Sequence, residues 1–159
     1  MLDFNIISVL NGAIITDLFV MWLMLIGQIK SKTLREWYNS YGISAVIADV
    51  LSIVIGVIIA SYLYPLLFSK YNIFKFLVLT VCVQLVHDLL FSQIFMSSRG
   101  SRILDTFKAY AKEMGPIVLF ADACMMVSTV LISKLIDTYK INYLLIFTIY
   151  LVPYFLYSL

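Results

Sequence analysis

With 159 residues, of which 63% are hydrophobic and only 13% are charged, the chain has too few polar groups to cover a soluble domain. Its mean hydropathy of +1.01 indicates an integral membrane protein whose main partner is the lipid bilayer. The formal net charge of +2, with no basic patch interleaved with aromatic residues, excludes nucleic acid as a partner.

Five apolar runs predict an all-α, polytopic transmembrane helix bundle of about five spans, forming one domain over residues 1–159. A helix needs about 20 residues to cross a hydrocarbon core of about 30 Å. The fifth run is short and contains Pro153, so an alternative is four spans with this segment lying in the membrane interface. The predicted spans are residues 6–27, 43–66, 74–96, 116–135 and 142–158.

Two basic segments, residues 32–41 and 102–114, follow the first and third predicted spans. Their apolar side chains recur at helical spacing, which predicts two short amphipathic helices lying along the membrane surface. Seven basic residues lie on this side and four on the other, so the positive-inside rule places this side and the C-terminus in the cytosol and the N-terminus outside. We expect Trp37, Tyr38 and Tyr110 to lie among the headgroups there. The seven are Lys30, Lys32, Arg35, Arg99, Arg102, Lys108 and Lys112, and the four are Lys70, Lys75, Lys134 and Lys140.

The first four spans are predicted to form a tandem repeat, in which residues 6–66 correspond to residues 74–135 and the span 142–158 is an addition. Both halves contain two spans and therefore run in the same direction, which predicts a pseudo-two-fold axis along the membrane normal. We expect the two-residue difference in length to fall in a loop, where an insertion costs little. The matched pairs are Trp37 with Tyr110, Gly42 with Gly115 and Asp49 with Asp122 at a shift of 73 residues, and Asp17 with Asp88 at a shift of 71.

Each of the first four spans contains one aspartate, and the four lie roughly 10–17 Å from the predicted cytosolic end. A carboxylate near the bilayer centre costs at least ~2.5–3.5 kcal/mol, so we expect the four to meet one another or a cation. Some of them are expected to carry a proton near neutral pH. The only histidine directly precedes one aspartate and shares its helix face with a glutamine. The predicted polar layer consists of Asp17, Asp49, Ser52, Gln84, His87, Asp88 and Asp122.

This polar layer predicts the binding or translocation of protons or cations, which needs only carboxylates and an imidazole within reach of water. A metal site is an alternative, because oxygen ligands with one imidazole suit Mn, Fe or Zn, but the spacing identifies no cofactor. The metal candidates are Asp49, His87, Asp88 and Asp122.

A second alternative is a structural role, in which the aspartates are hydrogen-bonding contacts between helices. An enzyme is not favoured, since no serine stands with His87 and an orienting acid in a known pattern. A lipid-modifying enzyme is the third alternative.

The two cysteines, Cys82 and Cys124, lie in apolar runs without a C-x-x-C motif, and we expect them in the core.

Three stretches, residues 48–56, 83–91 and 107–122, resemble small polytopic membrane proteins encoded by large DNA viruses of algae and protists. The similarity extends over about residues 42–135. It implies a host-cell or virion membrane and raises a structural or scaffolding role in a viral inner membrane, but it assigns no site residue. A homo-oligomer or complexes with other membrane proteins are further expectations.

Overall fold

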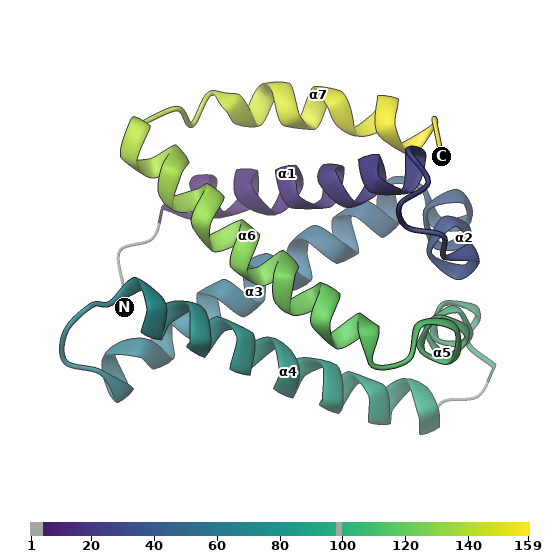
Figure 1. The fold of residues 1–159 in the computed structure, drawn as a ribbon, viewed down its shortest axis with the longest axis horizontal. Helices are drawn as coiled ribbons and strands as arrows, with labels where there is room; N and C mark the ends of the chain where they lie inside the picture. Colours follow the sequence, from purple (N-terminus) through teal and green to yellow (C-terminus); the bar gives the residue numbers. More distant parts are fainter. Residues whose placement is uncertain (1–4, 98–99) are drawn as a thin grey trace.

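The computed structural model describes residues 5–97 and 100–159, and every regular element in this part is an α-helix (Figure 1). The predicted all-α class is therefore confirmed. The helices are α1 (Ile6–Leu25), α2 (Lys32–Tyr41), α3 (Ile43–Leu67), α4 (Ile73–Ser97), α5 (Arg102–Met114), α6 (Ile117–Tyr139) and α7 (Leu144–Leu156).

Four of the described helices, α1, α3, α4 and α6, are long and apolar enough to cross a membrane. They contain 20, 25, 25 and 23 residues, so each reaches or exceeds the length that a span requires. The fifth predicted span does form a helix, but α7 has only 13 residues and is shorter than a usual span. It packs on α1 and runs back to the end of the bundle where α2 lies (Figure 1).

The two amphipathic helices have the predicted boundaries and lie at the same end of the bundle (Figure 1). The hydroxyls of Ser31 and Ser101 cap their first turns, by accepting a hydrogen bond from the backbone N–H three residues later. Gly42 and Gly115 end them with φ angles of +55° and +58°, which favour glycine.

The amphipathic helices of the two predicted halves differ in length, since α5 has 13 residues and α2 has 10. The repeat and the place of its two-residue insertion stay predictions.

Small and polar residues bring α1 close to its neighbours. A Cβ atom added at Gly12 would lie 2.5 Å from Ser133 Oγ and 2.8 Å from the backbone oxygen of Thr129, so α1 and α6 are in direct contact there. Thr129 Oγ1 also donates a hydrogen bond to Thr16 Oγ1 at 3.2 Å. Lipid cannot replace such partners, so these contacts fix where the helices cross.

Polar pairs also join α7 to α1. Ser8 Oγ donates to Asn142 Oδ1 at 2.8 Å, and Thr148 Oγ1 donates to Asn11 Oδ1 at 3.0 Å. Both pairs connect residues more than 130 positions apart in the chain. They make α7 a part of the bundle, whatever its depth in the membrane.

The two cysteines are exposed rather than buried. Cys82 lies on α4 and Cys124 on α6, both on outward faces of these long helices. The expectation that they belong to the core is wrong, because the lipid-facing side of a span is as apolar as its buried side.

Candidate functional site

Two of the four intramembrane aspartates are held by side chains of α2. Tyr38 Oη donates a hydrogen bond to Asp17 Oδ1 at 2.7 Å, and Trp37 Nε1 donates one to Asp49 Oδ2 at 3.0 Å. Asp17 has no exposed surface, and both aromatic side chains are buried. Their N–H and O–H groups turn inward to pair with carboxyls, and their depth relative to the headgroups stays a prediction.

The sequence of α2 explains why these two side chains point inward. Leu34, Trp37, Tyr38 and Tyr41 follow one another at three- and four-residue steps and form one face of the helix. The Trp37 ring packs against Tyr41 and against Phe107 of α5, with centroid distances of 4.8 and 5.0 Å. This aromatic contact joins the two amphipathic helices above the aspartates.

Tyr38 stays neutral and therefore remains a hydrogen-bond donor. Burial, followed by the charges of Asp17 and Asp49, raises the pKa of Tyr38 well above its ordinary value of 10.0. Its hydroxyl therefore keeps its proton at any physiological pH. Since both carboxyls act on this one hydroxyl, Asp17 and Asp49 lie close to each other.

Asp88 and His87 lie on α4, where Gln84 joins them. Gln84 Nε2 donates to Asp88 Oδ1 at 2.7 Å, and His87 Nδ1 lies 3.2 Å from the same oxygen. The second oxygen, Asp88 Oδ2, is buried and has no hydrogen-bond partner among the described residues. The His87 side chain is 50% exposed and that of Asp88 only 14%, so the histidine faces outward from the aspartate.

Asp122 of α6 connects the two groups. Its carboxyl lies within electrostatic range of Asp88 and Asp49. Burial, followed by the charges of Asp122, Asp49 and Glu113, raises the pKa of Tyr110 of α5, which places this phenol beside the carboxyls. No hydrogen bond joins Tyr110 to Asp122 among the described contacts, in contrast to the bond from Trp37 to Asp49. Electrostatic interactions link Asp17 to Asp49, Asp49 to Asp122 and Asp122 to Asp88.

The arrangement does not form a metal-binding cluster within the described residues. Across residues 5–97 and 100–159, no three His, Cys, Asp or Glu side chains lie close enough together to hold a metal ion. The metal candidates Asp49, His87, Asp88 and Asp122 are electrostatic neighbours but not one coordination sphere. The Ser52 hydroxyl donates to the backbone oxygen of Asp49 at 2.9 Å rather than to a carboxyl group.

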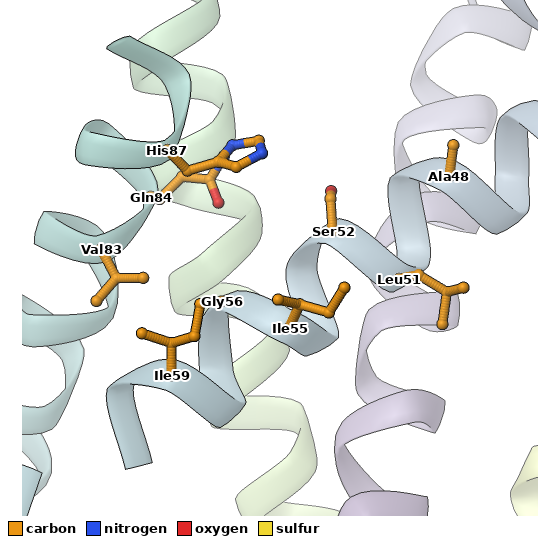
Figure 2. A pocket seen from close by; sticks show the side chains of 9 residues that line it. All are labelled: Ala48, Leu51, Ser52, Ile55, Gly56, Ile59, Val83, Gln84 and His87. Atoms are coloured by element: carbon orange, nitrogen blue, oxygen red, sulfur yellow. The ribbon is translucent and has the colours of Figure 1, made fainter. Parts of the chain in front are cut away.

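An open groove of about 250 Å³ lies between α3 and α4 (Figure 2). Three of the predicted site residues, Ser52, Gln84 and His87, contribute its polar atoms, and the rest of its lining is apolar or glycine. The other lining residues are Ala48, Leu51, Ile55, Gly56, Ile59 and Val83.

Sequence reasoning missed three aromatic residues of this site: Trp37 and Tyr38, which donate hydrogen bonds to carboxyls, and Tyr110, whose phenol lies within electrostatic range of Asp122. The signal was present in the predicted repeat, because the shift that superposes Asp49 on Asp122 also superposes Trp37 on Tyr110. Both aromatic residues lie 12 positions before their aspartate, on a helix that folds back over the end of the span.

No family model matches the chain, and neither the comparison with curated proteins nor that with solved structures gives a match. The class of the protein therefore follows from its fold and composition. The four long apolar helices are compatible, by length and composition, with a polytopic α-helical membrane protein.

Proposed function

We propose that this chain binds protons at its layer of carboxyl groups, as one step in moving them through the membrane. One observation carries the proposal: aspartates from four different long helices lie in electrostatic contact, and two of them, Asp17 and Asp88, have a buried oxygen without a partner among the described residues. A buried carboxyl oxygen without a donor is costly, and a bound proton or cation removes that cost.

The geometry supports protons more strongly than a multivalent metal. A proton needs a single oxygen, whereas a metal ion needs several ligands around one point. The four carboxyls interact electrostatically in pairs but form no metal-binding cluster within the described residues; Asp88 lies next to the half-exposed His87, and Asp17 accepts a hydrogen bond from α2. A small monovalent cation is the related alternative, since it can bind between two neighbouring carboxyls.

Proton flux into liposomes tests the proposal. Purified protein is reconstituted with an interior pH dye, and a membrane potential is imposed. We expect the wild type to acidify the interior faster than empty liposomes, and Asp88→Asn to lose this activity because an amide cannot ionise. The matched control is Asp105→Asn, which removes an exposed carboxylate of α5 paired with Lys108. A wild type indistinguishable from empty liposomes would contradict the proposal.

A structural function is the second candidate, and one observation favours it. The bonds from Tyr38 to Asp17 and from Trp37 to Asp49 attach α2 to α1 and α3, which is a sufficient role for these two aspartates. In that case the protein is a membrane scaffold, and the resemblance to viral proteins suggests a viral inner membrane as its place. Asp88→Asn would then keep or raise stability in detergent, because it removes a charge that is costly to bury.

A further inference from the structure

The Tyr38 hydroxyl lies where aspartates from two different spans meet. It donates to Asp17 Oδ1 of α1 at 2.7 Å, and it also interacts with the carboxyl group of Asp49 of α3. The charged groups that act on this hydroxyl are these two carboxyls. Tyr38 is 2% exposed and Asp17 has no exposed surface, so bulk water does not compete for the contact between them. Two carboxyl groups therefore converge on one phenol, which belongs to the short helix α2.

A hydroxyl group can donate and accept hydrogen bonds at the same time, and this distinguishes Tyr38 from its neighbour. Trp37 Nε1 donates to Asp49 Oδ2 at 3.0 Å, but the indole N–H has no lone pair with which to accept. Trp37 thus holds one oxygen of Asp49 and leaves the other for a proton. Of the two aromatic donors of α2, Tyr38 is the one that can receive a proton and release another from the same atom.

The carboxyls of Asp17 and Asp49 make no direct hydrogen bond in the described part of the chain. Asp17 Oδ1 accepts from Tyr38, and Asp17 Oδ2 has no partner among the described residues. A proton that crosses between α3 and α1 therefore needs an intermediate group. Burial and the two carboxyl charges raise the pKa of Tyr38 well above 10.0, so its hydroxyl always carries a proton to pass on.

We infer that the Tyr38 hydroxyl passes protons between Asp49 and Asp17, an inference that rests on the proposed function and names one residue of its path. In this step the O–H bond of protonated Asp49 breaks, and its proton binds Tyr38 Oη. The phenol O–H bond breaks at the same time, and that proton binds Asp17 Oδ1. The phenol is neutral before and after the step. Once Asp17 has released its proton, rotation of the hydroxyl restores the original hydrogen bond.

Fluorine NMR tests the contact that this step requires, and it does not depend on proton flux. Replacing Tyr38 with 3-fluorotyrosine keeps the hydroxyl and places one fluorine beside it, whose resonance reports the hydrogen bonds of the phenol. In detergent micelles, acidification should move this resonance as the two carboxyls take up protons. Asp49→Asn should reduce the size of the movement, whereas Asp122→Asn, which removes a charge near Asp49, should preserve it. A movement of unchanged size in Asp49→Asn would overturn the inference.

Proton flux into liposomes tests the transfer itself. Tyr38→Phe should reduce interior acidification to the level of empty liposomes, and 3-fluorotyrosine at the same position should retain the flux because it keeps the hydroxyl. Tyr41→Phe is the matched control and should behave as the wild type, since the Tyr41 hydroxyl makes only a long contact of 3.4 Å to Thr106. Wild-type flux in Tyr38→Phe would overturn the inference and leave the proposed function standing.

Two further outcomes separate this transfer from a structural role and from the proposed function. Flux is compared at equal amounts of folded protein, so a loss in Tyr38→Phe that only follows its unfolded fraction would contradict the transfer and assign Tyr38 a structural role. A wild type without flux would contradict the proposed function. The fluorine resonance then still decides whether Tyr38 joins the two carboxyls, as it does if Tyr38→Phe does not fold.

Discussion

At the scale of single residues, the aromatic side chains of α2 determine whether two aspartates are tolerable inside the bundle. Asp17 has no exposed surface, and its one hydrogen bond from a described residue comes from Tyr38 at 2.7 Å. The other oxygen has no partner in the described part of the chain. Asp17 therefore depends on a donor from a helix that is not itself a span.

Tyr38→Phe should lower the free energy of unfolding by about 1–3 kcal/mol, because it leaves a buried carboxyl without its donor. Tyr41→Phe is the matched control on the same helix, since the Tyr41 hydroxyl makes only a long contact of 3.4 Å to Thr106. Denaturant titration in detergent micelles measures both. The double variant Asp17→Leu/Tyr38→Phe should recover part of the loss, since the Asp17 carboxyl is then no longer left unpaired, while Asp49 still loses its contact with the Tyr38 hydroxyl. Equal effects of Tyr38→Phe and Tyr41→Phe would contradict this role.

At the scale of elements, two glycines allow helices to pack closely. Gly12 lies where α1 meets α6, and Gly56 lies where α3 meets α6. A Cβ at Gly12 meets the backbone of Thr129 at 2.8 Å, whereas a Cβ at Gly56 meets the flexible end of Met126 at 2.9 Å. A backbone atom can move only with its helix, but a methionine side chain can change rotamer.

Gly12→Ala should therefore destabilise the protein by about 1–3 kcal/mol, the usual cost of overpacking. Gly56→Ala should change stability by less than about 1 kcal/mol, because the helix propensity gained offsets the shift of Met126. Thermal unfolding of the two variants side by side gives the comparison. A greater loss for Gly56→Ala would show that the crossing of α1 and α6 is not the tighter contact.

A carboxylate also attaches α5 to α2. Glu113 accepts hydrogen bonds from the backbone N–H groups of Lys32 and Thr33 at 2.7 and 2.8 Å, and from the Thr33 hydroxyl. It thus stands at the N-terminus of α2, where the helix dipole favours an anion. The Thr33 hydroxyl first, and then the Thr33 and Lys32 backbone, lower the pKa of Glu113 from its ordinary 4.5.

The pKa of Glu113 is lower in the folded state than in the unfolded state. Its contribution to stability is therefore complete above about pH 4.5 and is lost as the pH falls through the pKa of the folded state. Trp37 packs against Phe107 of α5, so its fluorescence reports the contact in a Trp22→Phe background. Acidification should change the emission of Trp37, and Glu113→Gln should remove this pH-dependent step. Glu36→Gln, at an exposed position of α2, is the control. A pH-dependent step that persists in Glu113→Gln would show that Glu113 does not cause it.

The elements were predictable where their signals are local. Residues 32–41 and 102–114 form the predicted helices because serine caps, glycine ends and helical spacing all lie within each segment. The side of a span that faces inward was not predictable, since apolar residues cover both sides: Thr80 is fully buried while Cys82, two residues later, is exposed. The predicted carboxyl layer rests on depth along the spans, and its aromatic donors could not be predicted because they depend on how α2 folds back.

At the scale of the whole molecule, α2, α5 and the C-terminal end of α7 lie at one end of the bundle (Figure 1). The guanidinium of Arg35 donates to the backbone oxygen of Leu159, which fixes the chain end beside α2. The excess of basic residues at this end predicts that it faces the cytosol.

Single cysteines test this orientation in a Cys82→Ser/Cys124→Ser background. Asp105→Cys, on α5, should react with a membrane-impermeant maleimide only from the cytosolic side. Tyr71→Cys, 44% exposed in the loop between α3 and α4, should react only from the opposite side. The reverse pattern would show that the basic loops face outward.

The central claim, that the carboxyls act as one connected proton path, is tested most directly by comparing proton flux in three variants. Asp88→Asn, Asp122→Asn and the double variant are reconstituted at equal density, and interior acidification is followed under one imposed potential. A single path predicts that either substitution abolishes the flux and that the double variant is no slower than the single ones. Wild-type flux in Asp122→Asn, or flux that falls stepwise from single to double variant, would contradict the claim.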